Sequence, residues 1–530
     1  MGKAIKDEYQ TDYVVGQDNV AKFGLDMHNI VFPFTALLII AFVIGTLVFP
    51  STAGELLAGA KNGAIAIFDW GFLLSANLFV LFSLALIFMP VGKIRIGGVD
   101  AKPEFSLFSW FAMLFAAGMG IGLMFWSVAE PAAYYTDWYG TPLGVAANTP
   151  EGAKLAMGAT MYHWGLHPWA IYAIVGLSLA FFTYNKGLPL TIRSAFFPIL
   201  GDRVWGWPGN VIDIVAVLAT IFGLATSLGF GAQQAASGFS YLFGIDPGLN
   251  IQLAVIVGVT AAATMSVIRG IDGGVKLLSN INMALAALLL VFVLFVGSTL
   301  SIFQWVWETT VSYTTNMFAL SNPFGREEDT TWFHGWTVFY WAWWISWSPF
   351  VGMFIARVSK GRTVRQFVTA VLIIPTVITV VWMSTFGGSG LDQIQNDVGA
   401  LASEGITDTS LAMFQMLENL PLSSITSFLA IVLVLVFFVT SSDSGSLVID
   451  SITSGGKIDA PKTQRIFWAV SEGGIAGVLL FAGGDDALNA LQAGSVSVGL
   501  PFTFVLLVMC YSLFKGLHHE RRLLIAEGNM

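Results

Sequence analysis

The chain has 530 residues, of which 55% are hydrophobic and only 11% are charged, and its mean hydropathy is +0.74. Soluble globular proteins carry about 25% charged residues, so this composition excludes an ordinary soluble domain and indicates a polytopic membrane protein. The formal net charge of −9 is spread without any basic tract, so no nucleic-acid partner is expected.

Twelve long apolar segments predict twelve membrane-spanning helices, because a spanning helix needs roughly 20 apolar residues. The short alternating segments that are typical of a transmembrane barrel do not occur. The predicted spans are 29–49, 68–91, 105–127, 155–183, 208–240, 250–268, 281–303, 335–356, 367–388, 421–448, 466–483 and 494–515.

The lysines and arginines orient these helices. All of the 24 basic residues except Lys61, Lys154 and Arg326 lie in the two tails and the even-numbered connections, and none lies in the interior of a predicted span. Cytoplasmic loops carry an excess of lysine and arginine. The sequence therefore predicts a multi-pass protein of the bacterial inner (plasma) membrane with both termini in the cytoplasm.

The third predicted span contains three glycines in five residues, Gly118, Gly120 and Gly122. Each glycine disfavours continuous helix by about 1 kcal/mol relative to alanine. Transporters place non-helical backbone at mid-membrane, where it lines a binding cavity, and a break here would leave amide groups free for an anion. Because alternating small residues also permit close helix packing, both interpretations stay open.

The fourth predicted span combines aromatic residues with a histidine pair. Trp164, Trp169 and Tyr172 form the aromatic group. His163 and His167 are four residues apart, a spacing that can bind a metal, but no third ligand is close in the sequence. We therefore expect a structural role for the histidines, no transition metal, no cofactor and no enzymatic site.

Residues 304–323 are predicted to be neither a span nor a simple loop. Aromatic residues stand among polar ones in this segment, namely Trp305, Trp307, Tyr313 and Phe318. Such an amphipathic pattern favours a helix that lies in the outer membrane interface. An ordinary loop with interfacial aromatic residues is the alternative.

The eighth predicted span is rich in tryptophan. Trp344, Trp347 and Phe350 are spaced three apart and so form one stripe. Pro349 removes an amide donor, so we expect the helix to be broken there. An aromatic stripe usually packs or faces lipid, but facing rings can also hold a quaternary ammonium group, at about 0.5–2 kcal/mol for each ring.

The tenth predicted span carries a polar run from Thr440 to Ser446. Such a run is costly in lipid unless it faces protein, water or an ion, and its hydroxyl and carbonyl oxygens suit a hard monovalent cation. Capping of a polar helix end is the alternative. Asp443, within this run, is a candidate proton-carrying group.

Together these motifs resemble the betaine/choline/carnitine transporter (BCCT) family. The matching residues are the string from Gly335 to Arg365, the stretch from Pro103 through Gly118–Gly122 to Glu130 and Pro131, the residues Trp164, Trp169 and Tyr172, and the pair Thr440 and Ser441. The resemblance implies an all-α protein with a LeuT-like fold, in which two inverted five-helix repeats follow two extra helices, and a homotrimer.

On this sequence the resemblance implies six parts. They are the cytoplasmic tail 1–28, two peripheral helices in 29–104, the first repeat 105–303, a periplasmic interfacial helix and loop 304–334, the second repeat 335–515 and a short cytoplasmic tail 516–530. The implied function is import of a zwitterionic quaternary-ammonium or onium osmolyte, such as glycine betaine, by sodium symport with alternating access. A proton-coupled or exchange carrier for carnitine, ectoine, proline or dimethylsulfoniopropionate is the alternative.

The resemblance also implies the binding residues. The substrate site would consist of Trp164, Trp169, Tyr172, Trp344 and Trp347, with Gly118, Met119, Gly120 and Gly122 beside the substrate carboxylate. One sodium site would use Ala116, Met119, Phe437, Thr440 and Ser441, and a second would involve Thr220 and Phe350. Leu224 replaces a threonine of some sodium-coupled members, which leaves the stoichiometry open. Gly122 replaces an aspartate of choline-transporting members, which favours a zwitterion.

Overall fold

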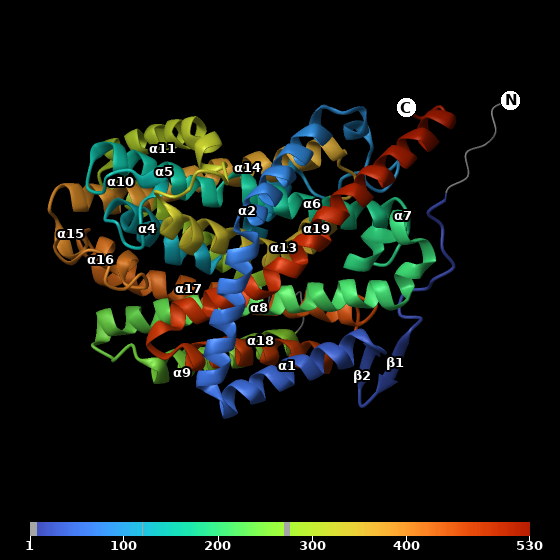
Figure 1. The fold of residues 1–530 in the computed structure, drawn as a ribbon, viewed down its shortest axis with the longest axis horizontal. Helices are drawn as coiled ribbons and strands as arrows, with labels where there is room; N and C mark the ends of the chain where they lie inside the picture. The colour runs from blue at the N-terminus through green and yellow to red at the C-terminus, as the bar shows by residue number, and fades with distance from the viewer. Residues whose placement is uncertain (1–7, 119, 270–275) are drawn as a thin grey trace.

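The computed structural model describes residues 8–118, 120–269 and 276–530. Apart from one two-stranded hairpin, its regular elements are helices (Figure 1). Within these residues, ten helical segments are long and apolar enough to cross a membrane, and the bent pair α3 (Leu107–Gly118) and α4 (Ile121–Tyr135) makes eleven. The chain is therefore a polytopic all-α membrane protein. The count of twelve is not confirmed, because α13 (Phe339–Val358), with its many tryptophans and polar residues, is not among these segments.

The N-terminal part has more structure than the sequence indicated. The elements are β1 (Asn19–Lys22) and β2 (Leu25–His28), which pair antiparallel, then α1 (Val31–Val48), α2 (Pro50–Phe88) and the short 3₁₀ helix η1 (Pro90–Lys93). The predicted connection between the first two spans is thus helical, with a kink at Phe68. Lys61 Nζ in this stretch donates to Gln492 Oε1 over 3.1 Å, a tertiary contact that a local pattern cannot indicate.

The middle of the chain follows the predicted spans with one exception. Its elements are α3, α4, η2 (Pro142–Gly144), α5 (Pro150–Trp164), α6 (Leu166–Tyr184), η3 (Ile192–Phe196), α7 (Phe197–Leu200), η4 (Gly201–Trp205), α8 (Trp207–Phe243), α9 (Leu249–Arg269) and α10 (Lys276–Val296). The fourth predicted span is divided at Gly165 into α5 and α6. Tyr313 Oη accepts a hydrogen bond from the backbone N–H of Leu166 over 2.9 Å, which satisfies an amide that the break exposes.

The predicted interfacial segment is a helix. α11 (Thr299–Leu320) begins earlier than expected and is not among the candidate spans. It packs against α5 and α14 (Val364–Gln395) with Trp305 and Tyr313 buried, whereas Trp307 and Phe318 are exposed. The predicted helix is therefore confirmed, and its position at the membrane interface stays a prediction.

The predicted break in the eighth span is wrong. Pro349 lies inside α13, which continues to Val358. A proline at this position cannot donate to the carbonyl of Ile345, four residues earlier. The Ser348 hydroxyl donates to that carbonyl over 2.7 Å instead, so the helix continues without an unsatisfied acceptor.

The remaining elements complete the second half of the chain. They are α12 (Thr330–Trp332) and the π-helical turn η6 (Phe333–Val338) before α13, and α14, α15 (Gly399–Glu404), α16 (Ala412–Glu418), α17 (Ser423–Thr453), α18 (Lys462–Gly483), η7 (Gly484–Asp486) and α19 (Ala487–Ala526) after it. The polar run of the tenth predicted span lies entirely within the continuous helix α17.

The β1–β2 hairpin and the C-terminal end of α19 lie at the same end of the molecule (Figure 1). In Figure 1 the β1–β2 hairpin and the last turns of α19 are on the right, and α15 and α16 are at the opposite end. The tryptophan-rich helix α13 lies near the centre of this view and packs against α6, α8 and α19, so its side chains are almost all buried.

Candidate functional site

The site is built around the break in the third predicted span. α3 ends at Gly118, α4 begins at Ile121, and the two helix axes differ by 67°. The predicted interruption is therefore confirmed. Met119, which was assigned to both the substrate and sodium sites, lies outside the described residues.

Two of the glycines at this break bring the backbone against aromatic rings. A Cβ atom on Gly118 would lie 2.5 Å from the Trp169 ring. A Cβ atom on Gly122 would lie 2.7 Å from the ring of Trp343 and 2.8 Å from that of Trp164. Real Cβ atoms are not found at such distances, so close packing is one reason for glycine at both positions.

The structure brings the predicted aromatic residues into one cluster. The ring centroids of Trp164 and Trp344 are 4.9 Å apart and the rings meet edge to face. Tyr172 lies 6.0 Å from Trp344 and 5.4 Å from Trp169, both also edge to face. Direct contact leaves no room for an onium group between Trp164 and Trp344. A ligand must therefore separate these two rings or bind on the side of Trp169 and Tyr172.

Two polar atoms in this region are buried and have no hydrogen-bond partner among the described residues, the Tyr172 hydroxyl and Trp347 Nε1. Trp347 also lies beside the break, because a Cβ atom on Gly120 would be 3.9 Å from its ring. A buried donor without a partner costs about 1–3 kcal/mol. Both donors are thus available to an anionic group of a ligand.

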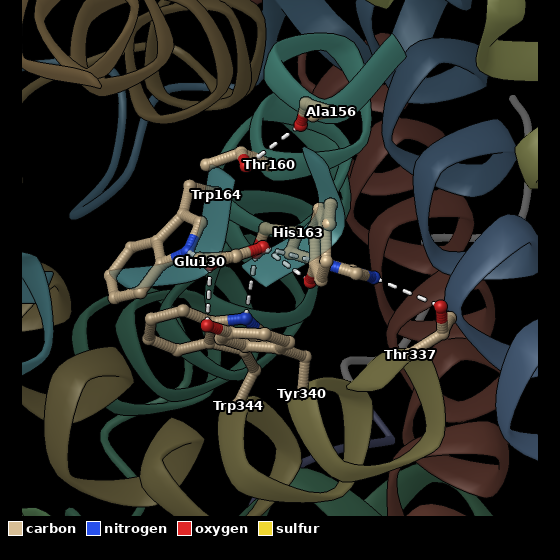
Figure 2. Close-up of polar contacts among 9 residues, drawn as sticks. Glu130, Ala156, Thr160, His163, Trp164, Thr337, Tyr340 and Trp344 are labelled. Atoms are coloured by element: carbon tan, nitrogen blue, oxygen red, sulfur yellow. Dashed lines mark hydrogen bonds and ion pairs between the residues drawn. The ribbon is translucent and has the colours of Figure 1, made fainter. Parts of the chain in front are cut away.

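A network of hydrogen bonds behind the cluster converges on Glu130 of α4, which is completely buried. Figure 2 shows this carboxylate between Trp164 and Tyr340. Its Oε2 accepts from Trp164 Nε1 over 2.7 Å and from the Tyr340 hydroxyl over 2.5 Å. Its Oε1 accepts from the Tyr134 hydroxyl over 2.8 Å and lies 2.9 Å from His163 Nδ1. The network joins α4 and α5 to α13.

The same network fixes Trp344. Trp344 Nε1 donates to the backbone carbonyl of His163 over 2.9 Å, and His163 Nε2 lies 2.9 Å from Thr337 Oγ1 (Figure 2). His167 has a different partner, since its Nε2 lies 3.1 Å from Asn77 Oδ1. No group of three or more metal-binding side chains occurs among the described residues. The two histidines therefore act in separate hydrogen-bond networks.

The sequence-based prediction missed the role of Glu130. Glu130 entered it only as part of a family motif, and Tyr340 only as one aromatic residue of a long run. A usable signal was present, because an acidic residue at the end of an apolar span usually requires buried partners. Which partners those are depends on helices that lie far apart in the sequence.

The polar run of α17 lies against the break from the other side. A Cβ atom on Gly120 would be 3.7 Å both from Ser441 Oγ and from the Phe437 ring. The Thr440 hydroxyl donates to the carbonyls of Val436 and Phe437 within its own helix, over 3.0 and 3.2 Å. Ser441 Oγ and the Phe437 ring are thus next to Gly120, just beyond α3, in whose last turn Ala116 lies.

The residues assigned to a second sodium site have separate neighbours. The Thr220 hydroxyl donates to the carbonyl of Ala216 in its own helix over 2.7 Å. Phe350 packs edge to face on Trp347, with centroids 5.5 Å apart. Leu224 fills the space beside Gly445 of α17, since a Cβ atom there would be 2.2 Å from its side chain. These contacts do not join Thr220 to Phe350.

Two buried acidic residues lie near the polar run. Asp443 accepts a hydrogen bond from the Ser266 hydroxyl over 2.5 Å. Glu472 of α18 accepts one from the Ser442 hydroxyl over 2.9 Å, and its other oxygen has no partner among the described residues. The seam between α17 and α18 is therefore acidic as well as hydroxyl-rich.

The region that is similar to known proteins includes all of the helices that form this site. A family model described as BCCT, betaine/carnitine/choline family transporter, matches residues 30–522. The chain is 64% identical over 513 residues to Glycine betaine transporter 1 of Vibrio parahaemolyticus, covering 97% of this chain and 98% of that relative. It is 62% identical over 511 residues to a glycine betaine/proline/choline/ectoine transporter of the same organism, covering 96% and 91%. It is 44% identical over 488 residues to the glycine betaine transporter OpuD of Bacillus subtilis, covering 91% and 93%.

Proposed function

This chain belongs to the BCCT family of betaine/carnitine/choline transporters, and on that premise we propose that it imports glycine betaine or a similar zwitterionic onium osmolyte by sodium symport with alternating access. As a member of this family it is a multi-span membrane transporter and not an enzyme. The observation that carries the proposal is the contact of Trp164, Trp344, Tyr172 and Trp169 beside the α3–α4 break.

The aromatic cluster complements the cationic end of the proposed substrate, and the donors beside the α3–α4 break complement its carboxylate end. Ring faces attract a permanent cation without a charged side chain, and each contributes about 0.5–2 kcal/mol. The buried hydroxyl of Tyr172 and Nε1 of Trp347, which have no partner among the described residues, are donors for the carboxylate. Gly122 offers no carboxylate at the position where choline-transporting members carry an aspartate, which favours a zwitterion over choline.

Sodium coupling is supported by the placement of α17. The hydroxyls of Thr440 and Ser441 and the carbonyl of Phe437 would bind the ion together with the end of α3 at Ala116 and with Met119. A hydroxyl that donates its proton to a carbonyl keeps its lone pairs for a cation, and Thr440 is in this state. A second ion near Thr220 and Phe350 has weaker support, because Leu224 offers no oxygen.

The test is uptake of labelled glycine betaine into proteoliposomes under three separate driving forces. An inward sodium gradient should drive accumulation, and its removal should reduce uptake to the level of protein-free vesicles. Uptake driven by a pH gradient alone would show that transport is coupled to protons and not to sodium. Asp443 would then be the candidate proton-carrying group. Uptake that needs no gradient, only internal substrate, would make the protein an exchanger.

A wider substrate range is the second candidate function. It is favoured by the relative that is 62% identical and is named for glycine betaine, proline, choline and ectoine. Competition of these compounds, of carnitine and of dimethylsulfoniopropionate against labelled betaine measures the range directly. If betaine competes less well than proline or ectoine, the assignment of an onium substrate fails.

The proposal also includes the membrane location, the oligomeric state and the orientation of the protein. We place it in the bacterial inner membrane as a homotrimer, in contact with membrane lipids and with both termini in the cytoplasm. Cysteines introduced one at a time into the β1–β2 hairpin and into the last turn of α19 should react with a membrane-impermeant reagent only in inverted vesicles. Labelling in right-side-out cells would contradict the orientation.

A further inference from the structure

We propose that Glu130 is a positioning residue that increases the affinity of the aromatic cluster for cationic head groups by polarising Trp164. This inference rests on the proposed onium transport and deepens it. Glu130 does not line the ring faces and lies behind the indole, at its N–H edge (Figure 2). Its effect would therefore reach the ligand through the ring and through space, without direct contact.

The geometry of the hydrogen bond supports this effect. Trp164 Nε1 lies 2.7 Å from Glu130 Oε2, which is short for an N–H···O bond and typical of a charged acceptor. Glu130 is fully buried and Trp164 is 1% exposed, so no solvent screens the contact. Three donors, Trp164 Nε1 and the hydroxyls of Tyr340 and Tyr134, point at a group that has only acceptors when ionised, an arrangement that suits a carboxylate.

The electrostatic consequence depends on ligand charge. A hydrogen bond to an ionised acceptor draws electron density toward the ring, which makes the negative π face more negative. The carboxylate also attracts a cation directly, and this attraction is strong where water is excluded. Both effects act on a trimethylammonium group and neither acts on an uncharged group of the same shape. Glu130 would therefore set the preference for onium over neutral head groups.

The two oxygens of the Glu130 carboxylate have different partners, so a matched pair of substitutions can separate their effects. Oε2 contacts Trp164 and Tyr340, whereas Oε1 contacts Tyr134 and His163. Glu130→Gln keeps an oxygen that can accept from Trp164 Nε1 but removes the charge. Tyr134→Phe removes one donor from Oε1, disturbs the same network to a similar extent, and leaves the charge and the Trp164 bond in place.

The experiment is isothermal titration of the purified full-length protein with two ligands of the same shape. One is glycine betaine. The other is 3,3-dimethylbutanoate (the tert-butylacetate anion), in which carbon replaces the quaternary nitrogen. For the unmodified protein we expect a clear preference for betaine. Glu130→Gln should reduce the ratio of the two affinities about tenfold, mainly through betaine, and Tyr134→Phe should leave the ratio unchanged.

The outcomes separate this inference from the proposed function. If the unmodified protein does not bind betaine, the proposed function fails and this inference fails with it. If betaine binds and Glu130→Gln weakens both ligands equally, Glu130 is only structural and this inference alone is wrong.

A second variant keeps the inference testable if Glu130→Gln does not fold. Trp164→Phe retains a π face but removes the N–H group that Glu130 polarises, and it should lower the same ratio. An unchanged ratio in that variant would also overturn the inference.

Discussion

Two polar regions of this transporter differ in where their hydrogen-bonding groups find partners. Around Glu130, side chains from α4, α5 and α13 supply four contacts to one carboxylate. In α17, the described hydrogen bonds of Thr440 go only to carbonyls of its own helix. Both regions lie beside the α3–α4 break, yet the Glu130 carboxylate is held by tertiary contacts, whereas the described hydrogen bonds of the Thr440 hydroxyl are local.

This difference suggests a division of roles. A buried carboxylate with four partners cannot exchange them without leaving polar groups unsatisfied, so the region around Glu130 is fixed. A hydroxyl bonded to its own helix can bind and release an ion without disturbing another helix. The first region would therefore orient the rings, and the second would respond to sodium. The first three predictions below test the two sides of this contrast, and the fourth concerns the end of α17.

The largest expected effect is that of Glu130→Ala on stability. Its removal leaves the donors of Trp164 and Tyr340 buried without an acceptor, and loss of one member of a buried charged network costs about 3–5 kcal/mol. Thermal unfolding in detergent should show a marked decrease in the melting temperature. Thr440→Ala is the matched comparison and should lower it only slightly. Equal decreases for both variants would remove the contrast between the two regions.

The second prediction concerns ring packing at Gly122. Gly122→Ala places a methyl group less than 3 Å from the rings of Trp164 and Trp343, and overpacking of this kind costs about 1–3 kcal/mol. Betaine affinity, measured by calorimetry, should decrease accordingly. Gly474→Ala is the control, because a Cβ atom there meets nothing within 4 Å. Unchanged affinity in Gly122→Ala would show that the rings have room to move.

The third prediction concerns the hydroxyls of α17. The double variant Thr440→Ala, Ser441→Ala should raise the sodium concentration for half-maximal uptake about thirtyfold, at about 1 kcal/mol for each lost oxygen contact. The fold should remain intact. Thr426→Ala is the control, because this threonine also donates to carbonyls of α17 itself. An unchanged sodium requirement in the double variant would place the ion elsewhere.

The smallest effect is expected at the C-terminal end of α17, where the β1–β2 hairpin docks. Asn19 of the hairpin donates to the carbonyl of Ser454 over 2.9 Å. Burial, and secondarily the charge of Arg193, lower the pKa of His28 from 6.5 to about 4. The backbone amides of Ile30 and Val31 donate to its Nδ1, which must therefore be unprotonated.

Because a detached hairpin binds this proton more readily, docking is fully favoured above pH 6.5 and weakens as the pH falls toward 4. The docking equilibrium should shift about tenfold between pH 7.5 and 5.5. Hydrogen exchange of residues 19–28 measures this shift, and His28→Gln should remove the pH dependence. Equal protection of the native hairpin at both pH values would contradict the assignment.

Parts of the site followed from local sequence. Three glycines within five residues predicted the break in the third span, because helix propensity is a property of neighbouring residues. The aromatic residues of the fourth and eighth spans were identified by composition and spacing, although their contact was only implied by resemblance. The partners of Glu130 could not be found in this way, because Tyr340 and His163 reach it from other helices.

Local residue patterns were enough to identify a polytopic helical membrane protein, the interruption of one span and the family of the chain. The division of the fourth span at Gly165 depends instead on a contact with a distant helix, and the continuation of α13 through Pro349 depends on a side-chain hydrogen bond within the folded helix. In the first case Tyr313 of α11 accepts from an exposed amide, and in the second the Ser348 hydroxyl replaces a missing donor. Inside a membrane every backbone group needs a partner, so a helix breaks or continues according to which partners the folded chain supplies.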